Sequence, residues 1–84
     1  MSKPTRDELA GALADAGAAH HDYESVTLGG KRDEQWSGFY AAYALGRLGN
    51  FAAPSTLSGW LEEAPAQEHW PTSAAGYVIE RMAE

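Results

Sequence analysis

The first part of the chain carries apolar residues at helical spacing on one face. Thr5 and Glu8 fit a capping box, in which Thr5 is the N-cap and the Glu8 carboxylate reaches back to its backbone N–H. Together these features predict a helix from about Arg6 to about Ser25, because residues three or four positions apart share a helix face. The residues on that face are Leu9, Ala12, Leu13, Ala16, His20 and Tyr23.

Glycines mark an expected close contact inside this helix and a break after it. Gly11 and Gly17 each cost about 1 kcal/mol relative to Ala in an exposed helix interior. We therefore expect them to allow the backbone of a neighbouring element to come close. Gly29 and Gly30 interrupt regular structure, so residues 26–32 are predicted to form a loop.

A second helix, from Asp33 to about Leu48, has apolar residues on both of its sides. Asp33 is the expected N-cap, and Gly49 is the residue expected to end the helix. A helix that is apolar on both sides is usually buried between neighbours, so this helix is predicted to be the central element. One side carries Trp36, Phe39, Tyr40, Tyr43 and Arg47, and the other carries Ala41, Leu45 and Leu48.

Prolines bound the two remaining predicted helices. A short third helix is expected over residues 55–64, with Ser55 or Thr56 as its cap and Pro65 at its end. Residues 65–71 are predicted to be a loop, and a fourth helix is expected to follow Thr72 and to run to near Arg81. The sequence thus predicts an all-α fold: one compact single domain over residues 1–84, a bundle of about four helices with its central helix near 33–48.

Composition excludes some kinds of site and disfavours some classes of partner. The chain has 84 residues, a formal net charge of -6 and no Cys, so disulfides and thiolate sites are excluded. The acidic balance argues against a nucleic-acid partner, because phosphate neutralisation supplies most of that affinity. The charged N-terminal segment and the lack of a membrane-length apolar run indicate a cytoplasmic protein with no membrane contact.

His20 and Glu24 are the first candidates for chemistry. They lie four residues apart and would project from one face of the first helix, where a metal ion could bind both. Two ligands do not complete a site, and a third would have to come from Asp33, Glu34 or His69. The structural alternative is a histidine at the edge of the core, hydrogen-bonded to a tyrosine or a carboxylate. That alternative is favoured, so no metal or other cofactor is predicted.

The aromatic side of the second helix is the next candidate. Trp36, Tyr40 and Tyr43 could line a ligand pocket, with Arg47 binding a carboxylate or phosphate. The alternative is a packed core with Arg47 lying over an aromatic ring. If the first two helices pack antiparallel, residues from both could form one hydrogen-bonded cluster: His20, Tyr23 and Glu24 with Tyr40, Tyr43 and Arg47. The candidate site residues are His20, Tyr23, Glu24, Trp36, Tyr40, Tyr43 and Arg47.

Other segments carry weaker signals. Gly29 and Gly30 precede a helix but lack a phosphate-loop pattern. No serine lies in a nucleophile-elbow setting, which disfavours nucleophilic catalysis. Trp60 and Trp70 flank the predicted 65–71 loop, where they would form either an exposed interaction patch or a small satellite core.

Residues 18–43 resemble a group of small bacterial helical proteins. The shared pattern is His-x-x-Tyr-Glu, a short loop, Asp-Glu-x-Trp, and then Phe-Tyr-Ala-x-Tyr. Here it runs from His20 through Asp33 and Trp36 to Tyr43. That group has no assigned activity. The resemblance therefore implies only that the His20/Glu24 and Trp36/Tyr40/Tyr43 positions belong to one structural unit.

The sequence leaves two functional hypotheses. The first is a non-enzymatic accessory or protein-interaction module, which could be a homodimer, because a thin core can be completed by a second copy or by another protein. The second is a small metal- or ligand-binding protein that uses His20 and Glu24 together with the aromatic side of the second helix.

Overall fold

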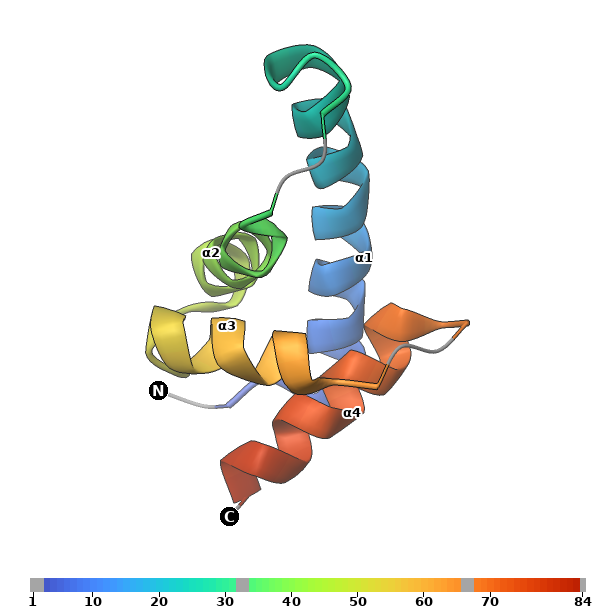
Figure 1. Ribbon diagram of the computed structural model, residues 1–84. Helices are drawn as coiled ribbons and strands as arrows, with labels where there is room; N and C mark the ends of the chain where they lie inside the picture. Colours follow the sequence, from blue (N-terminus) through green and yellow to red (C-terminus); the bar gives the residue numbers. More distant parts are fainter. Residues whose placement is uncertain (1–2, 32–33, 66–67, 84) are drawn as a thin grey trace.

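The chain folds into four α-helices and one π-helical turn (Figure 1). The computed structural model describes residues 3–31, 34–65 and 68–83, and these residues contain no strand. The all-α prediction of about four helices is therefore confirmed. In chain order the elements are α1 (Arg6–Asp22), η1 (Tyr23–Thr27), α2 (Trp36–Leu48), α3 (Pro54–Glu63) and α4 (Trp70–Ala83).

The start of α1 has the predicted capping box. The Thr5 hydroxyl accepts from the Glu8 N–H at 3.1 Å, and the Glu8 carboxylate accepts from the Thr5 N–H at 2.8 Å. Beyond Asp22 the chain continues as the π-helical turn η1 to Thr27. The predicted loop over 26–32 therefore begins two residues too early. Gly29 and Gly30, with φ of 63° and 86°, follow η1 in a backbone conformation that favours glycine.

α2 begins later than predicted and ends as predicted. Its first residue is Trp36 and its N-cap position is Gln35, without a side-chain cap, whereas the predicted cap Asp33 lies outside the described residues. Gly49 ends the helix with φ of 98°, and its N–H donates to the Leu45 carbonyl at 2.9 Å. Only glycine adopts such a positive φ without strain.

Proline positions explain two further corrections. α3 starts at Pro54 with Ala53 at the N-cap, so neither Ser55 nor Thr56 caps it. Proline suits the first helical position because its fixed φ is already helical and its missing N–H needs no partner there. α4 likewise starts before Pro71, and the predicted 65–71 loop is therefore wrong from Trp70 onwards.

Each helix packs against two others. α1 contacts α2 and α4, α2 contacts α1 and α3, and α3 also contacts α4. α2 therefore has a neighbour for each of its two apolar sides, but so do the other helices, and the contacts do not single out α2 as the central element. The buried core residues are Leu9, Ala12, Leu13, Ala16, Ala41, Ala44, Leu45, Leu57, Leu61, Ala64, Ala74, Ala75 and Val78.

A hydroxyl chain fixes α2 on α3. The Ser58 hydroxyl donates to Ser37 Oγ at 2.9 Å, and the Ser37 hydroxyl donates to Glu62 Oε2 at 2.8 Å. Ser37 is buried, so its hydroxyl requires the partners that it has. These hydrogen bonds link the two helices beside their apolar contact.

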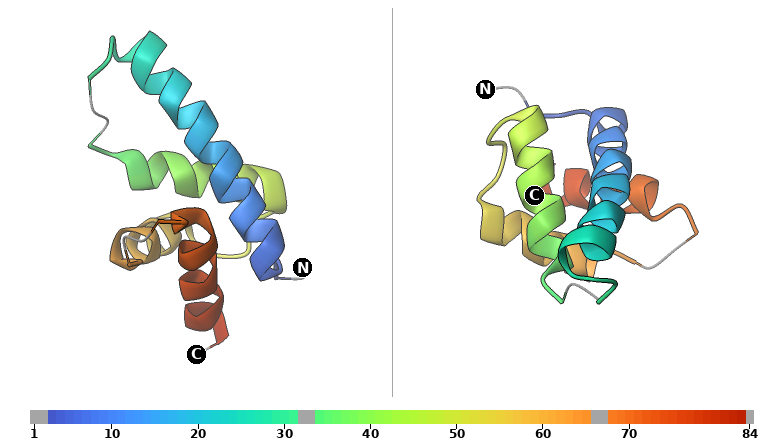
Figure 2. Two further views of the ribbon diagram at one scale, coloured as in Figure 1. Left: turned by 90° about the vertical axis from the view of Figure 1, so that its right-hand side faces the viewer. Right: turned by 90° about the horizontal axis from the view of Figure 1, so that it is seen from above.

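The end of α1 projects beyond the rest of the molecule. In Figures 1 and 2 the last turns of α1 and the π-helical turn extend past the other helices. The π-helical turn and the residue after it, residues 23–28, are hereafter called the tip. At the opposite end the Lys3 ammonium donates to the Met82 carbonyl at 3.1 Å, joining the two ends of the chain. None of the helices in the described ranges is long and apolar enough to cross a membrane.

The cap geometry predicts a difference between two otherwise similar substitutions. Thr5→Ala removes a hydroxyl that accepts a backbone N–H, so it should lower the free energy of unfolding by about 1 kcal/mol. Ser55→Ala is the matched control, since Ser55 is exposed and caps nothing, and its effect should stay within about 0.5 kcal/mol. Urea unfolding of both variants measures this, and equal losses would contradict the assignment.

Candidate functional site

His20 lies in a nest of aromatic rings at the end of α1. It is only 8% exposed, and its ring centroid is 5.0 Å from that of Phe39 and 5.3 Å from that of Tyr40. Its Nδ1 is 3.8 Å from Glu24 Oε1, one helical turn further along. The structure therefore places His20 at the edge of the core beside a carboxylate.

Six rings form one continuous group, hereafter the ring cluster. Tyr40 contacts Trp36 and Trp70 with centroids 5.8 and 5.4 Å apart, both nearly perpendicular at 86° and 89°. Trp36 and Trp70 also meet at 5.7 Å. Perpendicular contacts place the positive edge of one ring on the negative face of another, which stabilises aromatic pairs beyond their burial. The cluster consists of His20, Tyr23, Trp36, Phe39, Tyr40 and Trp70.

Trp70 is the member that the sequence analysis did not place here. It belongs to α4, and its ring reaches the rings of Trp36 and Tyr40 on α2, although the two helices themselves are not packed against each other. Trp70 extends the apolar spacing of α4 by one turn before Ala74 and Val78. Pro71 obscures that signal in the sequence, because a proline at this place suggests the end of a loop. In the structure Pro71 lies in the first turn of α4.

Tyr43 and Arg47 lie apart from the ring cluster. The Arg47 guanidinium forms an ion pair with Asp15 in the middle of α1. This hydrogen bond, the charge of Asp15 and a hydrogen bond with Tyr43 all hold the pKa of Arg47 above its ordinary value, although burial opposes the shift. α2 crosses α1 obliquely (Figure 2), which separates the two ends of α2. Arg47 thus links α1 to α2 and does not lie over a cluster ring.

Gly17 gives Tyr40 its space. A Cβ atom at Gly17 would lie 3.3 Å from the Tyr40 hydroxyl. The prediction that Gly17 allows a close contact is right, but the neighbour is the Tyr40 side chain and not a backbone. Gly11 has no atom within 4 Å of such a position, and the predicted close approach there is wrong. Burial, and secondarily the negative charge of Glu24, raise the pKa of Tyr40. Both effects disfavour the phenolate form.

Of the metal ligands that the sequence suggests, His20 and Glu24 lie close together, but the described residues supply no third. Glu34 and His69 are among these residues, whereas Asp33 lies outside them. Across the described ranges, no group of three or more His, Cys, Asp or Glu side chains is placed to hold a metal ion. His20 and Glu24 instead interact with each other.

A small pocket opens beside the ring cluster, between the tip and the start of α2. Its volume is about 220 Å³, and it is lined by Tyr23, Gln35, Gly38 and Phe39. Small-molecule sites usually measure roughly 300–1,000 Å³. This tip pocket is closer to the size of one or two side chains, because the rings themselves fill the space behind it.

Comparison with known proteins gives no relative: no family model, curated protein or solved structure matches the chain. The resemblance over residues 18–43 stays a prediction. Function must therefore be argued from the geometry of the chain itself.

The raised pKa of Tyr40 predicts a loss of stability at alkaline pH. A folded-state pKa above the unfolded value near 10.0 means that the unfolded chain releases its proton first. The contribution is complete below pH 10 and is lost as the pH rises through the folded-state pKa, by up to about 1.4 kcal/mol per pH unit.

Tyr40→Phe should remove part of this alkaline loss. Chemical unfolding at a series of pH values above neutrality measures the slope for the wild type and the variant. An unchanged slope in Tyr40→Phe would show that this hydroxyl is not the group responsible.

Proposed function

We propose that the chain is a non-enzymatic interaction module that pairs with a second copy of itself through the tip. The observation that carries the proposal is an exposed apolar side chain on the same projection as a small pocket that two aromatic residues, Tyr23 and Phe39, help to line. Val26 on η1 is 82% exposed, and among the described residues it is the only large apolar side chain that lies mainly in solvent. Tyr23, on the same π-helical turn, lines the tip pocket.

A projection and a pocket on one surface favour a two-fold dimer. A two-fold dimer buries the same surface on both copies. The projection of each copy can therefore enter the pocket of the other. Val26 of one copy would enter the tip pocket of the other, against Tyr23 and Phe39. Burying a valine side chain contributes roughly 1.5–3 kcal/mol, and the symmetric contact doubles this.

The electrostatics support an association led by apolar contact. A chain of net charge -6 repels a second copy at long range, and salt screens that repulsion over about 8 Å at physiological ionic strength. Among the described residues, the pKa values of Tyr40 and Arg47 are both raised, away from neutrality. Catalytic groups are usually tuned towards the working pH, so neither shift prepares its group for acid–base catalysis.

Glycines on α2 offer a sharp test of the pairing. Gly38 lines the tip pocket, Gly46 lies elsewhere on the same helix, and a Cβ added at either meets no atom within 4 Å. Gly38→Leu should fill the pocket and abolish dimer formation, whereas Gly46→Leu should leave it unchanged. Both should raise the free energy of unfolding by about 0.5–1 kcal/mol through helix propensity, so loss of pairing cannot come from unfolding.

Sedimentation equilibrium at micromolar concentrations measures the pairing of the purified chain. The wild type should dimerise, more strongly at high salt, and Val26→Ser should raise the dissociation constant on the order of 100-fold or more. A wild type that stays monomeric at high micromolar concentration would overturn the proposal. Equal behaviour of the Gly38→Leu and Gly46→Leu variants would rule out the tip pocket as the contact.

A further inference from the structure

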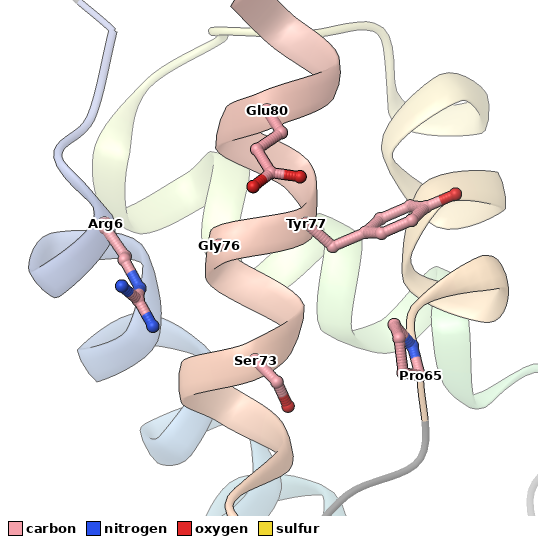
Figure 3. Close-up of a pocket in the computed structure, with 6 residues that line it drawn as sticks. All are labelled: Arg6, Pro65, Ser73, Gly76, Tyr77 and Glu80. Atoms are coloured by element: carbon pink, nitrogen blue, oxygen red, sulfur yellow. The ribbon is translucent and has the colours of Figure 1, made fainter.

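A second hollow lies on α4, near the start of α1 and the end of α3. Its volume is about 300 Å³, at the lower end of the range typical for small-molecule sites. Figure 3 shows its lining, in which Gly76 lies between the side chains of the neighbouring turns. The lining residues are Arg6, Pro65, Ser73, Gly76, Tyr77 and Glu80.

Gly76 lets the Arg6 side chain lie against α4. A Cβ atom at this position would be 3.4 Å from Arg6 Nε and 3.7 Å from Arg6 Cζ. The guanidinium of the first residue of α1 is thereby held beside the middle of α4. Because Gly76 has no side chain, the backbone of α4 forms part of the hollow (Figure 3).

The two charged groups at this hollow are opposite in sign. Within the described ranges, neither the Arg6 guanidinium nor the Glu80 carboxylate has an ion pair or a side-chain hydrogen bond. Tyr77, by contrast, is engaged, since its hydroxyl donates to Glu63 at 2.8 Å and accepts from Arg81 at 2.7 Å. The hollow thus presents one positive and one negative side chain to solvent.

Arg6 and Glu80 reach the hollow from neighbouring turns of its surface. Arg6 lies beside Gly76, and Glu80 is four residues further along α4, a rise of roughly 6 Å. Within the described ranges the two groups form no ion pair with each other. A compact molecule that carries both charges could therefore pair with both.

We propose that this hollow binds a free α-amino acid with an apolar side chain. Its carboxylate would pair with the Arg6 guanidinium, whose planar donors suit a carboxylate, and its ammonium group would pair with the Glu80 carboxylate. A single carbon separates the ammonium and carboxylate groups of an α-amino acid, so one small molecule presents both charges to the two side chains at the hollow. The rings of Tyr77 and Pro65 would contact its side chain. This site is separate from the tip and does not depend on dimer formation.

L-leucine is the probe, and two analogues test the need for both charges. Isocaproate lacks the ammonium group and isoamylamine lacks the carboxylate. Titration followed by amide NMR should give saturable shifts at Gly76 and Tyr77 with L-leucine in the millimolar range. Each analogue should bind about fivefold more weakly, the loss expected for one solvent-exposed ion pair.

Charge-neutralising variants locate the contacts. Arg6→Gln and Glu80→Gln should each weaken L-leucine binding about fivefold. Lys31→Gln and Asp22→Asn change the net charge by the same amounts near the tip and should leave binding unchanged. Absence of a saturable shift at millimolar L-leucine would overturn the proposal. Equal binding of leucine and either analogue, or equal effects of the two pairs of variants, would overturn it as well.

Discussion

The perpendicular packing of Tyr40 between Trp36 and Trp70 is the contact on which the rest of the arrangement depends. A domain of this size buries a limited share of its surface, and alanine supplies much of the core here. Large rings must therefore provide a disproportionate part of the buried apolar area. Because Trp70 comes from α4, this contact joins that helix to α2 and, through His20, to the end of α1.

The same packing decides where function can lie. Rings pack against one another along the aromatic side of α2, where a ligand pocket was one prediction. Arg47 is engaged with Asp15. His20 is held among aromatic rings beside Glu24. Within the described residues, two hollows lie towards opposite ends of the molecule: the small pocket beside the tip, and the hollow over Gly76. The proposed functions are placed there for that reason.

Local signals predicted the fold well, and contacts between distant segments limited the prediction of the site. The Thr5 capping box and the end of α2 at Gly49 depend on a few adjacent residues and appear as expected. The position of Trp70 depends on where α4 begins, and Pro71 suggested a loop when it lies in the first helical turn. The separation of Arg47 from the ring cluster follows from the oblique crossing of two helices, which spacing along one helix does not encode.

A double-mutant cycle between Tyr40 and Trp70 tests the central role of the ring cluster most directly. Tyr40→Leu, Trp70→Leu and the double variant are compared with the wild type by chemical unfolding. An edge-to-face pair predicts a coupling free energy of about 0.5–1.5 kcal/mol, with the double variant losing less than the sum of the single losses. Losses that add to within about 0.3 kcal/mol would contradict the claim that this contact joins α4 to α2.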